Sequence, residues 1–384
     1  MLDNKMTAKT IIFWWPDATF NDVHWKKDPG SIPIELKRLG YKVILAVGKF
    51  ASSKRSDEID IIETNIHEKS SFAMNIINRI NGFLSMIKIM RKHHPDTIIV
   101  EHSQIEAVLI MTLLKFYKKI IFKHSPLLIL KLDADPESPD VQNNNSIYVF
   151  YRYIYTKSFD YIACESECSY NILTKPRLIE KYKNKYRIIP DGFYYDRISD
   201  NNNYPRQNII LSVGRIHPQK GHDILIEIFS KLKDKFPDWQ LRIAGLVDDQ
   251  SYMKALKKQI IDLNLCNSVK LITNISDEEL IKEYKQSSIF CLLSRWGGFD
   301  IAKAEAIHYG LPIVITEAAC GIYYKKYGSF VCNINDKNSI FEALSTLMSN
   351  PALRLEISKK QKDAILTWRD VALEFKKLIE IENN

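Results

Sequence analysis

Two basic residues flank a short loop in the segment ILSVGRIHPQKGHDILIEIF, residues 210–229. An apolar strand-like run leads to Gly214, which suits a tight turn, and a helical pattern follows the loop. The loop is not a P-loop, because lysine precedes glycine and no serine or threonine follows, and it is not a GxGxxG loop either. Arg215 and Lys220 together would balance the charge of a diphosphate, with the arginine binding in a forked geometry. A pair of solvated surface cations is the alternative that this stretch alone leaves open.

A second segment, RWGGFDIAKAEAIHYGLP at residues 295–312, combines a glycine pair with the start of a helix. Gly297 and Gly298 allow a backbone to approach a ligand closely. Helix amides at Phe299 to Ile301 are donors for phosphate or sugar oxygens. Glu305 lies on the same side of this helix, where a carboxylate would accept hydrogen bonds from both hydroxyls of a ribose; an ion pair with a basic neighbour is the alternative. The two segments together predict an anion site that also binds sugar hydroxyls.

These loops need a scaffold of strands and helices. Short β-branched runs, among them KIIFKH at 119–124, alternate with helical patterns along the chain, which is typical of parallel sheets covered on both faces. The Asn/Pro-rich stretch 200–207 is the expected linker. We therefore expect an α/β protein of two Rossmann-like domains, 1–203 and 204–364, with parallel sheets facing a central cleft, followed by an amphipathic helix at 365–384. Ligands in such folds bind at the carboxyl ends of the strands.

The composition is that of a soluble globular protein, with 384 residues of which 46% are hydrophobic and 26% charged. No apolar run reaches the roughly 20 residues of a membrane-spanning helix, and the first residues lack the sections of a signal peptide, so we expect a cytoplasmic protein. The formal net charge of +8 favours an anionic partner. Nucleic acid is disfavoured, because no arginine–aromatic motif accompanies the spread basic residues. The six cysteines lack a metal-ligand spacing and are expected to be buried, reduced thiols.

Four segments resemble the donor half of glycosyltransferase family 4, whose members have the GT-B fold. They are the two segments already quoted, VKLITNISDEELIKEYKQSSIFCLLS (269–294) and TWRDVALEF (367–375). The likeness covers most of residues 205–384 and continues more weakly through the first half. It implies a retaining, metal-independent transfer of a hexose, without a cofactor, from a UDP- or GDP-linked donor. The acceptor would be a glycan, a lipid-linked molecule or another hydroxyl compound. The resemblance also implies that the final helix crosses back onto the first domain.

The same resemblance implies roles for single residues. Arg215 and Lys220 would hold the donor diphosphate, and Glu305, as the second acid of an E-x7-E pair, would bind the ribose. His124 stands in FKHSP, which we expect to end a strand at the cleft, and it resembles a family histidine near the donor sugar. Gly30 stands where the family has a glycine-rich loop that approaches the donor phosphate. Arg215, Lys220 and His124 are therefore the candidate catalytic residues.

The sequence departs from the family at the first acid of the E-x7-E pair, because Gly297 stands in its place. Asp300 replaces a residue that is usually glycine in the family. This aspartate either reaches the sugar hydroxyls in place of the missing acid or caps the following helix, and both interpretations stay open at this point. The missing acid also leaves open a non-catalytic GT-B protein that binds a nucleotide or a partner. A sugar-nucleotide epimerase is a further alternative, which the family resemblance disfavours.

Three further features concern the ligands. Asp133 and Asp135 form a DxD pair that would bind a divalent cation on a diphosphate, but the duplicated architecture favours fixed cations instead, and no metal site is predicted. The nucleobase is expected to contact backbone near Gly245 and Ile275. The helical pattern at 70–95 either covers the sheet or docks on an anionic membrane while the cleft reaches a lipid-linked acceptor.

Overall fold

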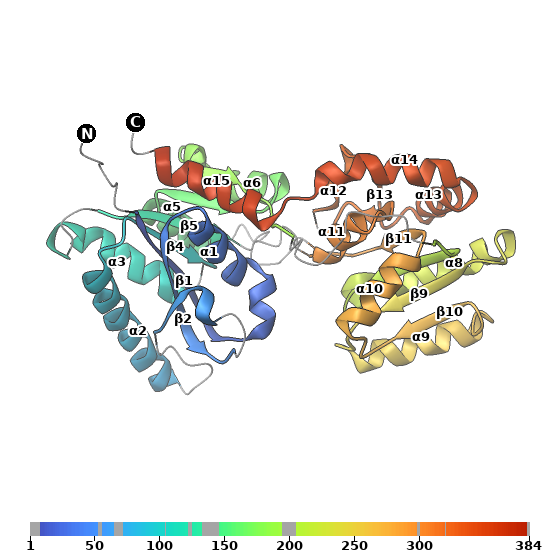
Figure 1. Cartoon of the computed structure of the whole chain (residues 1–384), viewed down its shortest axis with the longest axis horizontal. Helices are drawn as coiled ribbons and strands as arrows, with labels where there is room; N and C mark the ends of the chain where they lie inside the picture. The colour runs from blue at the N-terminus through green and yellow to red at the C-terminus, as the bar shows by residue number, and fades with distance from the viewer. Residues whose placement is uncertain are drawn as a thin grey trace. The chain divides into compact units, whose positions relative to one another are not determined.

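The computed structural model describes residues 8–52, 56–64, 72–103, 105–121, 125–132, 146–193, 205–297, 300–318 and 320–381. Contacts divide the chain into two compact α/β units (Figure 1). Unit 1 comprises Met1–Ala134, Pro139–Tyr194 and Leu366–Asn384, and unit 2 comprises Asp135–Ser138 and Tyr195–Ile365. The predicted boundary between residues 203 and 204 lies outside the described residues.

Within the described ranges, unit 1 has a parallel sheet of seven strands in the order β3-β2-β1-β4-β5-β6-β7. Its strands are β1 (Thr10–Phe20), β2 (Lys42–Phe50), β3 (Asp60–Glu63), β4 (Thr97–Glu101), β5 (Leu127–Leu132), β6 (Tyr161–Cys164) and β7 (Tyr186–Ile188). Its helices are α1 (Asp28–Arg38), α2 (Phe72–His93), α3 (Ile105–Ile121), α5 (Ser146–Ser158), α6 (Glu167–Thr174), α7 (Arg177–Glu180) and α15 (Trp368–Ile381), with the 3-10 turns η1 (Asp22–Lys26), η2 (Ser56–Glu58) and η3 (Lys183–Lys185).

Alternation along β1 explains why both faces of this sheet are covered. Ile11 and Phe13 point to one face, where they pack with apolar residues of α1 and α15. Ile12 and Trp14 point to the other face, where the core includes residues of α2, α3 and α5. The C-terminal helix α15, drawn in red, thus belongs to the core of unit 1 although it follows unit 2 in the sequence (Figure 1).

The described part of unit 2 has a parallel sheet of six strands in the order β10-β9-β8-β11-β12-β13. Its strands are β8 (Ile209–Val213), β9 (Gln240–Ala244), β10 (Val269–Ile272), β11 (Ile289–Leu292), β12 (Ile313–Thr316) and β13 (Phe330–Cys332). Its helices are α8 (His222–Lys235), α9 (Gln250–Asp262), α10 (Asp277–Gln286), α11 (Ile301–His308), α12 (Gly321–Lys325), α13 (Lys337–Ser349) and α14 (Pro351–Gln361), with the turns η4 (Pro218–Lys220) and η5 (Lys362–Ala364).

The predicted architecture of two α/β parts with parallel sheets is confirmed, and the apolar runs predicted as strands in the second half all form strands. One strand prediction in the first half is wrong. The run at 119–124 begins inside α3, which ends at Ile121, and the next strand is β5. The error has a physical reason, since a short apolar run has no periodicity that separates a strand from the end of a buried helix.

Two other expectations concern surfaces and cysteines. Met86 and Met90 of α2 are buried in the core of unit 1, so the described end of this helix covers the sheet. Across the described ranges, no helix combines the length and the apolarity that crossing a bilayer requires. Four cysteines are buried, but Cys168 and Cys266 are exposed, which corrects the expectation that all six are buried.

Candidate functional site

The loop after β8 is shaped by three glycines. A side chain at Gly245 would place its Cβ 1.9 Å from the carbonyl oxygen of Gly214. The two backbone segments can therefore lie this close only because residue 245 is glycine. Gly221 has a φ of +64°, and a Cβ on it would lie 2.0 Å from the carbonyl oxygen of Leu293. The Lys-Gly order of the sequence is therefore explained, because Gly221 turns the chain from η4 into α8 directly after Lys220.

Backbone and side-chain hydrogen bonds tie this loop to the second predicted segment. The amide of Arg295 donates to the carbonyl oxygen of Gln219 at 2.7 Å, and the side-chain amide of Gln219 donates to the carbonyl oxygen of Trp296 at 3.0 Å. The Arg295 guanidinium donates to both carboxylate oxygens of Asp223, at 3.0 and 2.7 Å. The two segments thus form one site at the carboxyl ends of β8 and β11, as the sequence predicts.

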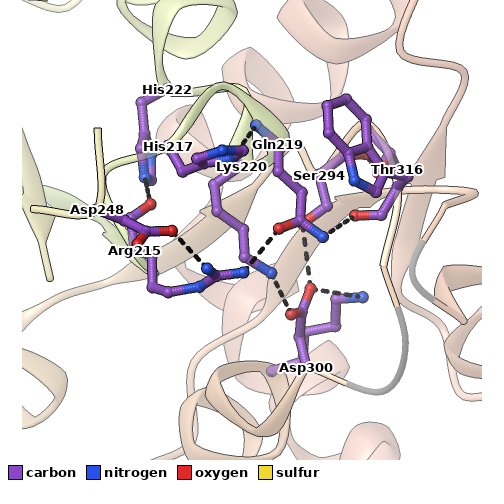
Figure 2. A network of polar contacts seen from close by, with 11 residues as sticks. Arg215, His217, Gln219, Lys220, His222, Asp248, Ser294, Asp300 and Thr316 are labelled. Atoms are coloured by element: carbon purple, nitrogen blue, oxygen red, sulfur yellow. Dashed lines mark hydrogen bonds and ion pairs between the residues drawn. The ribbon is translucent and has the colours of Figure 1, made fainter. Parts of the chain in front are cut away.

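Lys220 is buried and points to Asp300 (Figure 2). Its Nζ lies 2.5 Å from Oδ1 of that carboxylate. Its aliphatic part passes close to Gly214, where an added Cβ would meet Lys220 Cγ at 3.3 Å. The lysine therefore stands at the carboxyl end of β8 with a fixed stem and an ammonium group held by the Asp300 carboxylate.

Arg215 lies at the open side of the same loop (Figure 2). Its Nη1 donates to Asp248 Oδ2 at 2.5 Å and its Nη2 donates to Gln219 Oε1 at 3.0 Å. The side chains of Arg215 and Asp248 are 55% and 41% exposed, so this ion pair is solvated and can exchange its partners easily. The structure therefore brings Arg215 and Lys220 together in one loop, with a carboxylate partner for each.

Of the two interpretations of Asp300 that the sequence leaves open, the structure does not bear out a side-chain cap of the following helix. Asp300 stands at the N-cap position of α11, but its side chain makes no capping hydrogen bond. Its Oδ2 instead accepts from Ser294 Oγ at 3.1 Å and lies 3.5 Å from Lys303 Nζ. Burial by itself raises the pKa of Asp300, but the nearby Lys303 and Lys220 hold this pKa below its ordinary value. Asp300 is therefore an ionised carboxylate shared by Ser294 and two lysines.

Lys303 is a site residue that the sequence analysis missed. It lies on the buried side of α11 with only 1% of its side chain exposed. Burial lowers the pKa of Lys303 below its ordinary value, and the Asp300 carboxylate opposes this effect. The sequence contains a weak signal for this pair, because Asp300 and Lys303 are three apart, which is a contact spacing at the start of a helix.

Glu305 lies in α11, one turn after the helix begins, and the phenol of Tyr284 is its hydrogen-bond partner. The hydroxyl of buried Tyr284 donates to Glu305 Oε2 at 2.7 Å. Burial and the Glu305 carboxylate raise the pKa of Tyr284 well above its usual value, so the phenol stays a donor. Ile301 begins the same helix, and Ile275 is partly buried against a neighbouring apolar cluster of unit 2. The ligand roles of Glu305, Ile301 and Ile275 stay predictions.

Gly297 has a backbone conformation that explains the absence of an acid. Its φ is +145°, a conformation that residues with a side chain rarely adopt. A glutamate at this position would therefore strain the loop, whatever space surrounds it. Gly298 and Phe299, predicted to approach the donor, lie outside the described residues.

His222 contacts the backbone of this loop at Arg215 (Figure 2). It is fully buried, with Nε2 3.3 Å from the carbonyl oxygen of Arg215 and Nδ1 3.4 Å from Ser212 Oγ. Burial lowers the pKa of His222 to about 4. The imidazole is therefore neutral at neutral pH and holds the backbone of the loop after β8 through hydrogen bonds.

A pH dependence of stability follows from His222. Because its pKa falls from 6.5 to about 4 on folding, the unfolded chain binds more protons between these values. The contribution of His222 to stability is complete above about pH 6.5, and about 3 kcal/mol of it is lost as the pH falls to about 4. We expect His222→Gln to lack this slope, so that the difference in unfolding free energy between the wild type and the variant shrinks on acidification. A difference that is constant from pH 7 to 4 would contradict this assignment.

Of the predicted site residues in unit 1, one lies in a different element than expected and others lie outside the described residues. His124 lies outside them, and in the run 119–124, which was expected to be a strand, the described residues 119–121 belong to α3. Gly30 is not in a loop but in the first turn of α1, where an added Cβ would lie 2.6 Å from the carbonyl oxygen of His24. Its missing side chain thus serves the packing of α1 against η1. Asp133 and Asp135 lie outside the described residues.

A cluster of charges that the sequence analysis missed lies at the carboxyl ends of the strands in unit 1. Lys131, 1% exposed, forms ion pairs with Asp28 and, at 3.0 Å, with Asp191. The Asp191, Asp28, Glu101 and Glu165 carboxylates raise the pKa of Lys131 well above its ordinary value, although burial opposes them. Only the tertiary structure could reveal the cluster, because its members come from five separate places in the sequence.

The comparison with known families concerns unit 2. Residues 196–364 match the family described as glycosyl transferases group 1. An uncharacterized glycosyltransferase of Haemophilus influenzae is 34% identical over 156 residues, which are 40% of this chain and 43% of that protein. The mannosylfructose-phosphate synthase of Agrobacterium fabrum is 29% identical over 174 residues, 41% of this chain and 38% of that protein. The chain thus spans about two fifths of the length of these relatives.

Solved structures resemble the whole chain. The sucrose-phosphate synthase of Thermosynechococcus elongatus has a TM-score of 0.71 at 14% identity, over 96% of this chain and 98% of that chain. The HepE protein of Anabaena, solved in complex with UDP, has a TM-score of 0.71 at 15% identity, over 97% and 99%. The chain has the GT-B fold. The predicted fold class is confirmed. The match of unit 2 to the group 1 family supports the prediction that the protein is a transferase. The finer assignment to family 4 stays a prediction.

Proposed function

We propose that the protein transfers a hexose from a nucleoside-diphosphate sugar to a hydroxyl group of a glycan or lipid-linked acceptor. The observation that supports this most is the arrangement in unit 2, where Arg215 and Lys220 share one loop and Glu305 follows on the adjoining helix α11, within the part that matches group 1 glycosyltransferases. A relative solved with UDP favours uridine as the base, with guanosine as the alternative.

In this proposal the two cations do the work that a metal does elsewhere. Lys220 and Arg215 would stabilise the negative charge that grows on the departing diphosphate. Each now pairs with a carboxylate, Asp300 or Asp248, so a donor phosphate would have to compete for both cations. The leaving phosphate oxygen would assist the incoming hydroxyl on the same face of the sugar, which retains the anomeric configuration.

A screen of UDP-, GDP- and ADP-sugars against hydroxyl acceptors, with and without EDTA, tests the proposal. A glycoside product with the donor's anomeric configuration, at a rate that EDTA leaves unchanged, is the expected result. Nucleotide binding without turnover would favour the non-catalytic alternative, for which the absence of an acid at Gly297 is the supporting observation. A strict need for manganese or magnesium would overturn the metal-independent mechanism.

Glu305→Gln is expected to weaken the binding of a nucleoside diphosphate about 10- to 100-fold, the cost of a hydrogen bond to a charged group. The fold should persist, because the amide oxygen still accepts from Tyr284. Calorimetry with UDP and its 2′,3′-dideoxy analogue checks the result. The wild type should lose affinity for the dideoxy compound, and the variant should lose little more. Equal affinities for UDP in both proteins would show that Glu305 serves only Tyr284.

A peripheral contact with an anionic membrane, expected from the net charge of +8, is part of the same proposal for a lipid-linked acceptor. Co-sedimentation with vesicles of neutral and of anionic phospholipid tests it. Retention by anionic vesicles alone, lost at high salt, is the expected result, and a protein that stays in solution with both would overturn this part.

A further inference from the structure

The Asp300 carboxylate joins two lysines through different oxygens. Lys220 Nζ lies 2.5 Å from Oδ1, and Ser294 Oγ donates to Oδ2 (Figure 2). Lys303 Nζ lies 3.5 Å from Oδ2. The shorter contact is a charge-assisted hydrogen bond, and the longer one is an ion pair with room to tighten. Asp300 therefore has one ammonium partner at hydrogen-bond distance and a second one further away.

The two lysines differ in access to solvent. The Lys220 side chain is 9% exposed and that of Asp300 is 14% exposed, whereas the Lys303 side chain is only 1% exposed. Lys303 Nζ also lies 6.0 Å from the ring centroid of buried Tyr324. Lys220 is thus the lysine that a ligand can reach, and Lys303 is enclosed behind the carboxylate.

A donor phosphate can bind Lys220 only if the lysine turns away from Asp300. In a buried site, a carboxylate that loses its sole partner is costly, and this cost would be subtracted from the binding of the donor. Lys303 removes much of the cost, because its ammonium group can move closer to Asp300 as Lys220 leaves. Two ammonium groups and one carboxylate also leave one excess positive charge for the phosphate.

We propose that Lys303 is a positioning residue that holds Asp300 in place when Lys220 turns from Asp300 to the diphosphate of the donor. This inference rests on the proposed function, since it deepens the role of the same site. In this inference Asp300 competes with the donor diphosphate for Lys220. The inference predicts that Asp300 competes more strongly when Lys303 is removed.

Binding of UDP, GDP and inorganic pyrophosphate to the full chain, measured by calorimetry, tests the inference. Lys303→Met should weaken binding about tenfold, because Lys220 is then the only ammonium partner of Asp300. Adding Asp300→Asn to Lys303→Met should restore the affinity to within about threefold of the wild type, since no carboxylate competes any longer. Unchanged affinity in Lys303→Met, or no recovery in the double variant, would overturn the inference.

A measurement without ligand separates this inference from the proposed function. Lys220→Met and Lys303→Met should each lower the thermal midpoint slightly, because one lysine still serves Asp300. The combination should lower it by roughly 6–12 °C more than the sum, and Asp300→Asn should recover most of that loss. Additive losses would contradict the inference that the two lysines share the Asp300 carboxylate. If the wild type binds no diphosphate, the proposed function fails, whereas the non-additive loss would still support the exchange of partners at Asp300.

Discussion

Replacing Lys220 by methionine is expected to slow sugar transfer about 100- to 1,000-fold, the usual cost of removing one preorganised donor to a developing negative charge. Lys220 is buried beside Asp300 at the carboxyl end of β8, so its ammonium group is fixed where the diphosphate is proposed to lie. Steady-state kinetics with the donor found in the screen would show the effect mainly in kcat/KM.

The fold of the Lys220→Met variant should persist, because Asp300 keeps Ser294 and Lys303 as partners. Lys337→Met is a matched control, since it removes an ion pair with Glu227 in which the side chains are 45% and 38% exposed. This control should change neither turnover nor stability by a measurable amount. Near-normal turnover of Lys220→Met would rule out the proposed phosphate site.

The largest loss of stability is expected for Lys131→Met in unit 1, at about 3–5 kcal/mol. Lys131 is the buried cation between Asp28 and Asp191. Its replacement removes the positive charge next to two carboxylates that are largely shielded from water. Since domains are stable by about 5–15 kcal/mol, this loss would bring unit 1 close to unfolding. Urea unfolding followed by tryptophan fluorescence measures it, because Trp14 and Trp368 are buried in unit 1.

A variant that fails to fold would still be informative when compared with Lys131→Met combined with Asp28→Asn and Asp191→Asn. The triple variant should recover much of the lost stability, because the two carboxylates that form ion pairs with Lys131 are then replaced by neutral amides. Lys183→Met serves as the control, since its ion pair with Glu180 has side chains that are 45% and 59% exposed. A loss for Lys131→Met no larger than that of this control would contradict the charge cluster.

The sequence alone predicted the fold class well because its strongest signal is local. Fully apolar runs such as those of β8 and β11 can only be buried in sheets covered on both faces, and the helical patterns between them supply the cover. Where the local signal is ambiguous, the prediction failed, as at the apolar end of α3. Gly221 is explained by a local requirement as well, because its φ of +64° directly after Lys220 is a conformation that favours glycine.

The partners of the charged residues were decided by the tertiary structure. The sequence places Arg215 and Lys220 in one loop, but it does not show that Lys220 would meet Asp300, which lies 80 positions further on. It leaves open whether Asp300 caps the helix or reaches a sugar, and only the fold shows that its side chain lies beside two lysine ammonium groups and makes no cap. Residue type and spacing thus determine which groups are available, whereas burial and the packing of distant segments decide which of them pair, since electrostatic interactions strengthen only where water is excluded.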